Sequence, residues 1–344
     1  MIKVGIIGAG LIGGKRADSL KAFPEKCTLS SVCDVEPEKA LSLAARHGAS
    51  AYDDWRKLLR ESAVDAIIIA TPNCFLKDIA VFALRKGRHV LCEKPLGRTA
   101  GEAADIFFAA QETGKILKTG FNHRHHSAIW EAKRLASEGA VGQIYYIRCV
   151  YGHGGRPGYE KEWRANREIC GGGELLDQGV HVMDLFRWFM GEFEEAYGRT
   201  ATYAWNMGVE DNAFALFRTK AGKLAMMHTS WSQWKNKFLF EIFGEKGYLI
   251  VDGLGGSYGQ ERLIIGTRKI GAKGYAGGPP EEKVIEYPGP DISWQEEWRE
   301  FLSAVEEGRE PLGSGYDGLM ANRMIEAVYR SDKENKPVLI ESET

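Results

Sequence analysis

Short apolar runs alternate with longer amphipathic stretches along the first part of the chain. The runs occupy residues 3–7, 28–34, 65–70, 89–92 and 115–119. Runs of this length without a polar face are typical of strands that are buried on both sides of a parallel sheet. Helical patterns follow several of them, at residues 12–22, 74–86 and 99–113. This alternation predicts a doubly wound α/β domain.

Beyond residue 121 the pattern changes to strands that alternate apolar and polar positions. Such strands are expected at residues 143–151, 196–205, 212–219, 223–233, 238–243 and 248–251, with hairpin turns at 220–223 and 244–247. Helices are expected at 127–138, 293–307 and 316–333, a Gly- and Pro-rich loop at 271–280, and a last strand at 337–340. The second part is therefore predicted as an α+β domain with a large, predominantly antiparallel open sheet and helices on one face.

The 344 residues exceed what one hydrophobic core usually supports. We therefore predict two domains, a dinucleotide-binding domain at residues 1–121 and an α+β domain for substrate binding and oligomerisation at residues 122–344.

The helix expected after the glycines at 171–173 carries ionisable groups in an apolar surround. At about 100° per residue, Asp177, His181, Asp184 and Trp188 fall on one narrow stripe, and apolar side chains cover the remaining circumference. Burying an unpaired carboxylate costs several kcal/mol, roughly 3–5 when a partner is lost. The stripe is thus either the wall of a polar site or a core in which His181 and Asp177 satisfy each other.

Composition and charge exclude several classes of protein. Hydrophobic residues make up 44% and charged residues 27% of the chain, and the net charge is -2. These values are ordinary for a globular protein and give no electrostatic footprint for nucleic acid or an acidic membrane. The six cysteines lack CxxC spacing, no signal peptide precedes the first strand, and no apolar run reaches transmembrane length. We expect a cytoplasmic protein with reduced thiols and no nucleic-acid or membrane partner.

A glycine motif stands between the first strand and the first helix. Its glycines allow a tight turn and a close approach of pyrophosphate to the helix start, and Asp34 follows about 20 residues later, where an acid can bind the ribose hydroxyls of NAD. An acid repels the 2′-phosphate of NADP, so NAD is favoured. Arg16 would weaken this preference near the adenosine, unless it lies on a solvated helix face. The predicted cofactor-binding residues here are Gly8, Gly10, Leu11, Ile12, Gly13 and Asp34.

Further candidates follow two of the later strands. Ligands of open parallel sheets lie at the carboxyl ends of the strands, so nicotinamide and substrate are expected beside these residues. For Lys94 the alternative is a surface lysine held by Pro95. The residues are Thr71, Pro72, Asn73, Glu93 and Lys94.

Three motifs in this order resemble the glucose-fructose oxidoreductase and inositol dehydrogenase family, Gfo/Idh/MocA, over essentially the whole chain. They are the glycine motif at 8–13, Glu93-Lys94-Pro95, and the segment at 172–181 that contains Asp177 and His181. The resemblance implies an NAD(P)-dependent dehydrogenase that acts on hydroxyl-bearing carbons of sugars, cyclitols or nucleotide sugars. It also implies that Lys94, Asp177 and His181 are the catalytic residues. Gly14-Lys-Arg16 departs from the histidine that many members carry, which bears on cofactor binding.

Oxidation of an alcohol needs a base for the hydroxyl proton and a positive group for the developing oxyanion. His181 is favoured as the base and Asp177 as its orienting partner, with Lys94 on the same oxygen, but Lys94 itself is the alternative base. Asp184 is expected to be a structural partner. No metal site is expected, because Asp177 and His181 supply two ligands, and the His-Arg-His-His run at 123–126 opens a helix without carboxylate or cysteine neighbours.

The loop at 152–173 combines basic and aromatic residues immediately before the helix. Arginine forks bind phosphate oxygens and aromatic rings stack on sugars, so the loop predicts a nucleotide-sugar diphosphate; a solvated basic lid is the alternative. This loop and residues 231–236 resemble the family branch encoded with polysaccharide and nucleotide-sugar pathways. Asn122 and Arg124 contact substrate or cofactor, or else are solvated helix-start residues. The predicted substrate-binding set is Lys94, Asn122, Arg124, Arg156, Tyr159, Trp163, Arg164, Asp177 and His181.

The sequence also allows other functions and indicates self-association. A free sugar or cyclitol is the alternative substrate, and an NAD-dependent glycosidase or a non-catalytic cofactor-binding regulator is the alternative class. Retention of Lys94, Asp177 and His181 together argues against the regulator. Residues 228–234 and the neighbouring strands are expected to place large aromatics on an open sheet face that forms a homodimer or homotetramer, unless a loop of the same chain covers this face.

Overall fold

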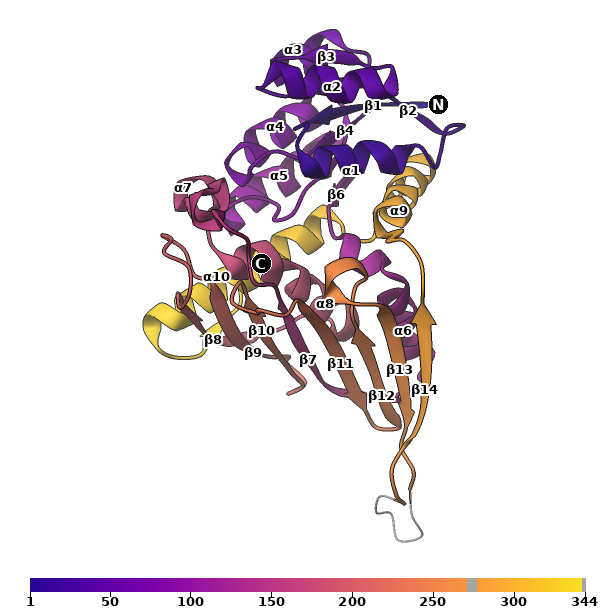
Figure 1. The fold of residues 1–344 in the computed structure, drawn as a ribbon, viewed down its shortest axis with the longest axis vertical. Helices are drawn as coiled ribbons and strands as arrows, with labels where there is room; N and C mark the ends of the chain where they lie inside the picture. The colour runs from indigo at the N-terminus through magenta and orange to yellow at the C-terminus, as the bar shows by residue number, and fades with distance from the viewer. Residues whose placement is uncertain (271–276, 342–344) are drawn as a thin grey trace. The chain divides into compact units, whose positions relative to one another are not determined.

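The computed structural model describes residues 1–270 and 277–341. The chain forms two compact units, each built from several segments and coloured along the chain in Figure 1. The first unit comprises Met1–Asn122, Glu168–Gly171 and Trp294–Asn322, and the second comprises His123–Arg167, Gly172–Ser293 and Arg323–Thr344. Whether residues 1–121 and 122–344 are independent domains stays a prediction.

The first unit contains a parallel sheet, as expected. In the described part of the chain it has six strands in the order β3-β2-β1-β4-β5-β6. Successive strands are added on one side of β1 and then on the other, as in a doubly wound dinucleotide-binding fold. The apolar runs form its strands because both faces of the sheet are covered. The strands are β1 (Ile2–Ile7), β2 (Cys27–Cys33), β3 (Ser50–Tyr52), β4 (Ala66–Ile69), β5 (His89–Cys92) and β6 (Leu117–Thr119).

Helices cover both faces of this sheet. One core joins the sheet to α1 (Leu11–Leu20), α2 (Pro37–His47) and α9 (Ser293–Glu307), and the other joins it to α3 (Trp55–Glu61), α4 (Asn73–Arg85) and α5 (Ala100–Thr113). Side chains of Asp54 and Thr99 cap the starts of α3 and α5. Helix α9 has the bounds expected from the sequence. The sequence pattern placed it in the second domain, whereas its Trp298 and Phe301 lie in the core of the first unit.

The second unit contains the large sheet, and the predicted fold class is confirmed. Within the described residues this sheet has nine strands in the order β14-β13-β12-β11-β7-β10-β9-β8-β15. All neighbours are antiparallel except β7 and β10. The strands are β7 (Ile144–Gly152), β8 (Glu195–Ala201), β9 (Asn212–Arg218), β10 (Leu224–Ser230), β11 (Lys237–Gly244), β12 (Gly247–Asp252), β13 (Glu261–Thr267), β14 (Glu281–Tyr287) and β15 (Val338–Leu339).

Strands β13 and β14 lie where the sequence pattern predicted no strand. Residues 271–276 of the expected loop at 271–280 lie outside the described residues. Helix α6 (Ser127–Ser137) packs against β12 to β14, and α8 (Val180–Met190) packs against β7 (Figure 1). The last helix, α10, spans Gly315–Glu334.

The opposite face of the large sheet exposes apolar side chains. Tyr146, Phe214 and Met226 are 37%, 44% and 49% exposed, so no described segment of this chain covers them. Within residues 228–234 the prediction is wrong at Trp231, which follows the end of β10 and is buried, whereas His228 lies in β10 and stacks on Phe214. The open face is instead formed by residues of β7, β9 and β10.

Candidate active site

The glycine turn has the geometry that a dinucleotide requires. Gly8 has a φ of +99°, and a Cβ on it would lie 2.5 Å from the carbonyl oxygen of Ala70. A Cβ on Gly13 would lie 1.9 Å from the carbonyl oxygen of Gly8, so the helix can approach the strand only without a side chain there. A Cβ on Gly10 would meet no atom within 4 Å. The space before the first turn of α1 therefore suits a pyrophosphate, and the residues present fit NAD.

Asp34 directly follows β2, and backbone amides orient its carboxylate. Its Oδ2 accepts a hydrogen bond from the Ala9 amide at 2.7 Å, and its Oδ1 accepts one from the Glu36 amide at 2.9 Å. The first of these contacts ties the carboxylate to the glycine turn. Asp34 thus lies where the sequence predicted an acid for the adenosine ribose.

The residues after β4 face different partners. The side-chain amide of Asn73 is buried and donates to the carbonyl oxygen of Cys170 at 2.7 Å. The Thr71 hydroxyl is buried and has no hydrogen-bond partner among the residues that the structure describes. Pro72 is the residue before α4. Their predicted roles in cofactor binding stay predictions.

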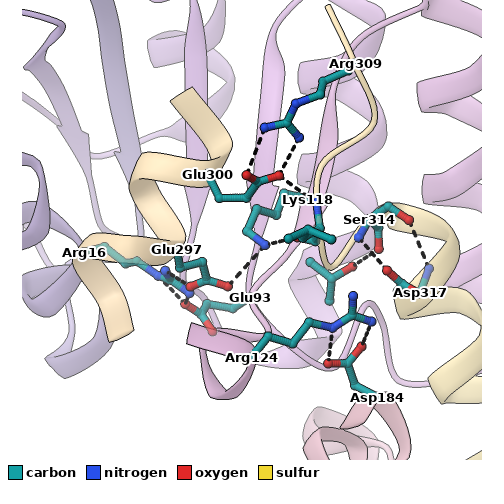
Figure 2. Close-up of polar contacts among 12 residues, drawn as sticks. Arg16, Glu93, Lys118, Arg124, Asp184, Glu297, Glu300, Arg309, Ser314 and Asp317 are labelled. Atoms are coloured by element: carbon teal, nitrogen blue, oxygen red, sulfur yellow. Dashed lines mark hydrogen bonds and ion pairs between the residues drawn. The ribbon is translucent and has the colours of Figure 1, made fainter. Parts of the chain in front are cut away.

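Arg16 is fully buried, so its interpretation as part of a solvated helix face is wrong. Its guanidinium donates to Glu93, with Nε 2.7 Å from Oε1, and to Glu297 of α9 (Figure 2). Burial raises the pKa of Glu93, while Arg16 opposes that rise. Lys94, the next residue, is half-buried at the carboxyl end of β5. Arg16 therefore contacts the Glu93-Lys94-Pro95 motif.

In the second unit a π-helical turn, η4 (Leu175–Gly179), precedes α8. The prediction of one regular helix at 100° per residue is therefore wrong across Asp177, because a π turn holds more residues than an α turn. A Cβ on Gly179 would lie 3.1 Å from the Leu175 side chain and 3.4 Å from the Met227 side chain of β10. Single π turns are frequent at functional sites.

The glycines before this turn are required by its neighbours. A Cβ on Gly172 would lie 2.2 Å from the Tyr329 hydroxyl, and one on Gly173 would lie 2.0 Å from the Glu210 carbonyl oxygen. The Glu210 Oε1 accepts from the amides of Gly173 and Leu175 and from the Tyr329 hydroxyl. Burial raises the pKa of Glu210, and these three donors oppose the rise. Sequence reasoning missed Glu210, because no local motif marks a carboxylate that caps a helix from another segment.

His181 is buried against a second histidine. Its ring stacks on that of His123 with 3.7 Å between centroids and 20° between planes. The His123 Nε2 lies 3.1 Å from the Tyr151 hydroxyl, which contacts the Tyr258 hydroxyl, and the Gln178 amide donates to Tyr258 at 3.0 Å. Burial raises the pKa of Tyr151 well above its usual value and that of Tyr258 to about 12, so both hydroxyls stay protonated at neutral pH. The sequence did not indicate these neighbours.

Asp177 faces the basic loop. The Arg164 Nε lies 3.5 Å from the Asp177 Oδ2, and its Nη1 lies 3.7 Å from the Glu162 Oε2. Arg156 forms a fork with the same Glu162, at 2.8 and 2.7 Å. Two predicted phosphate-binding arginines are thus each paired with carboxylates of the chain.

The aromatic residues of that loop differ in their surroundings. Tyr159 is buried and packs edge-on against Trp231, with 5.0 Å between ring centroids. Trp163 is partly exposed and lies under the guanidinium of Arg164. Of the two predicted stacking rings, Trp163 is the one that keeps an accessible surface.

The residues before α6 are also buried. Arg124 forms a fork with Asp184, at 2.7 and 2.5 Å, so Asp184 is a structural partner as expected. Asn122 and Arg124 are 6% and 2% exposed, which rules out the alternative of solvated helix-start residues. The expectation that the histidine run lacks a carboxylate neighbour is wrong, because Glu261 lies 3.3 Å from the His126 Nδ1. No group of three metal-ligating side chains occurs within residues 1–270 and 277–341.

Comparison with known families agrees with this geometry. The model described as an oxidoreductase family with an NAD-binding Rossmann fold matches residues 2–121, and the model of the GFO/IDH/MocA C-terminal domain matches residues 129–250. The chain belongs to the Gfo/Idh/MocA oxidoreductase family. The predictions of this family, of an NAD-binding oxidoreductase and of a Rossmann domain are therefore confirmed.

Several Gfo/Idh/MocA relatives are dehydrogenases. The chain is 28% identical to inositol 2-dehydrogenase of Rubrobacter xylanophilus, over 99% of this chain and 94% of that protein. It is 31% identical to levoglucosan dehydrogenase of Pseudarthrobacter phenanthrenivorans, but this match covers 59% of the chain and 54% of that protein. A solved levoglucosan dehydrogenase with NADH has the same fold, with a TM-score of 0.89 at 24% identity over 99% of this chain and 100% of that one. None of the described helices is long and apolar enough to cross a membrane.

Proposed function

We propose that this Gfo/Idh/MocA protein oxidises a secondary hydroxyl of an unphosphorylated sugar or cyclitol with NAD. The observation that carries the proposal is the chemistry around His181 and Asp177. The Tyr151 hydroxyl contacts His123, and the Tyr258 hydroxyl and the Gln178 amide continue this row of uncharged donors and acceptors. Such groups suit a polyol, whose own groups are uncharged hydroxyls.

The residues have distinct roles in the proposed reaction. His181 accepts the hydroxyl proton, since imidazole exchanges protons near neutral pH, and Asp177 stabilises the charge that forms. The proposed role of Lys94 is to supply a positive charge that stabilises an oxygen as its negative charge develops. NAD, when bound, would accept the hydride that leaves the carbon. The hydroxyl-bearing carbon becomes a carbonyl, and one proton and one hydride are removed.

A nucleotide sugar is the second candidate, favoured by the exposed Arg156 and by Arg164 in the same loop. Both guanidinium groups already contact carboxylates, Glu162 for the first and Glu162 and Asp177 for the second. A diphosphate would have to displace these contacts, and it would meet the negative charge of Glu162. This charge balance favours the unphosphorylated substrate.

A substrate panel tests the choice. With NAD present, we expect free polyols such as myo-inositol, levoglucosan and methyl glucosides to give NADH with kcat/KM at least about tenfold above any nucleotide sugar, a difference of about 1.4 kcal/mol. Arg156→Ala should leave kcat/KM for the polyol within about twofold, because its contact is a surface ion pair. A nucleotide sugar used more efficiently, with a large loss in Arg156→Ala, would reverse the assignment. Glycoside cleavage without net NADH would indicate the glycosidase class.

A further inference from the structure

A buried ionic cluster joins three distant segments of the first unit. Arg16 lies in α1, Glu93 at the end of β5 and Glu297 in α9 (Figure 2). The Arg16 Nε and Nη2 lie 2.7 and 2.6 Å from the Glu93 Oε1, and its Nη1 donates to the Glu297 Oε2. The side chains are 0%, 10% and 0% exposed, in that order. One guanidinium thus bridges two carboxylates away from solvent.

The cluster is balanced in charge by a fourth residue. The Lys118 Nζ lies 3.8 Å from the Glu297 Oε1 and donates to the Leu312 carbonyl oxygen. Burial alone would lower the pKa of Arg16, but Glu297 and Glu93 outweigh it and raise that pKa. Arg16 therefore stays charged. Two cations face two carboxylates, and loss of either cation would leave an uncompensated buried charge.

The strand end that carries Glu93 is held on three sides. The Glu93 amide donates to the Ile69 carbonyl oxygen at 3.0 Å, and the Gly120 amide donates to the Cys92 carbonyl oxygen at 2.8 Å. A Cβ on Gly120 would lie 2.9 Å from both the Arg16 Nη2 and the Glu93 Oε2. The arginine therefore completes a tight enclosure around the residue that precedes Lys94.

We propose that Arg16 is a positioning residue for Lys94: it fixes Glu93 and so couples the end of β5 to the helix that follows the glycine turn. Glu297 in turn fixes Arg16. This inference rests on the proposed catalytic role of Lys94. Lys94 directly follows Glu93 in the sequence. Because Arg16 holds the Glu93 side chain in place, it also restricts the backbone from which Lys94 extends.

The test separates positioning from stability by restoring charge without restoring geometry. Arg16→Met leaves one unbalanced carboxylate and should lower the Tm strongly. Arg16→Met with Glu297→Gln balances the cluster again, so the Tm should recover, while kcat stays at least about tenfold below wild type and the Kd for NADH stays within about threefold. Recovery of kcat together with the Tm would show a purely structural role and overturn the proposal.

Three further variants complete the test. Gly120→Ala changes no charge but crowds the Arg16–Glu93 contact, and it should lower kcat at least about fivefold with a small change in Tm. Unchanged kcat in this variant would also contradict the proposal. Lys21→Met, which removes an exposed ion pair at the end of the same helix, is the matched control and should change neither value. Lys94→Met, measured in parallel, tests the lysine itself: unchanged kcat there would refute the proposed function, whatever Arg16 does.

Discussion

Asp34 is the residue from which cofactor choice follows. A 2′-phosphate would meet its carboxylate, so NADH should bind at least about tenfold tighter than NADPH. Asp34→Asn should narrow this gap, because it removes the charge but keeps an oxygen for the Ala9 amide. Asp34→Ala should also weaken NADH, since the glycine turn loses that acceptor. Fluorescence titration of each variant checks this, and equal affinities of the wild type for both cofactors would refute it.

Glu210 gives a prediction about pH. Burial raises its pKa, so the folded state disfavours the ionised form; its contribution to stability is full below the ordinary carboxyl pKa and is lost as pH rises through the raised folded value. Glu210→Gln keeps an oxygen for the three donors. The unfolding free energy of this variant should therefore fall less than that of wild type as pH rises above the ordinary carboxyl pKa of about 4.

Glu210→Ala is the control for the hydrogen bonds. It leaves the amides of Gly173 and Leu175 and the Tyr329 hydroxyl without this acceptor, and it should destabilise the protein by about 2–3 kcal/mol at all pH values. Denaturant unfolding across the pH range measures both variants. Parallel pH curves for wild type and Glu210→Gln would show that the ionisation of Glu210 does not affect folding.

Individual residues could be predicted from the sequence where the reason is local. Gly8 and Gly13 follow from the strand–turn–helix pattern alone, and their contacts are those that the pattern requires. Arg16 could not be placed, because its second partner, Glu297, is 281 positions away. The sequence marks His123 only as part of a histidine run, because its stacking on His181 depends on how the segment before α6 packs against α8.

At the scale of elements, α9 is predicted to be essential to the first unit. Its Trp298 is fully buried in the core beside Val4 and Ile6. Trp298→Ala should lower the unfolding free energy by about 3–5 kcal/mol and weaken NADH binding through loss of the folded unit. Trp130→Ala, at a partly exposed position of α6, should cost far less. Similar losses in the two variants, measured by denaturant unfolding, would contradict this account of the core.

Elements were predicted well where packing imposes a simple period. The buried parallel strands and α9 follow the apolar pattern closely, as at His89–Cys92 and Ser293–Glu307. Strand β14, with four exposed residues at its start, has no buried face that a pattern could reveal. The π turn at Leu175–Gly179 could not be predicted from the sequence, because its Leu175 amide donates to Glu210 from a distant segment and no local spacing marks the turn.

At the scale of the whole molecule, the open sheet face predicts self-association. Its exposed apolar residues form an association surface, and we expect a homodimer or homotetramer at micromolar concentration. Phe214→Glu with Met226→Glu should dissociate it, because each copy would bury charges. Light scattering measures the molar mass of the wild type and of the double variant. Trp234→Glu, at a position outside the strands, is the control. A monomeric wild type would remove the prediction.

In the proposed reaction, hydride passes from a hydroxyl-bearing carbon to NAD, with Lys94, Asp177 and His181 as the catalytic residues. Transfer of deuterium from the carbinol carbon of a labelled polyol to NAD, read by mass spectrometry of the NADH formed, tests it most directly. We predict stoichiometric transfer by the wild type, and a rate about 10²–10⁴-fold lower in His181→Asn and Lys94→Met with NADH affinity retained. NADH without the label, or variants that transfer it at the wild-type rate, would contradict the account.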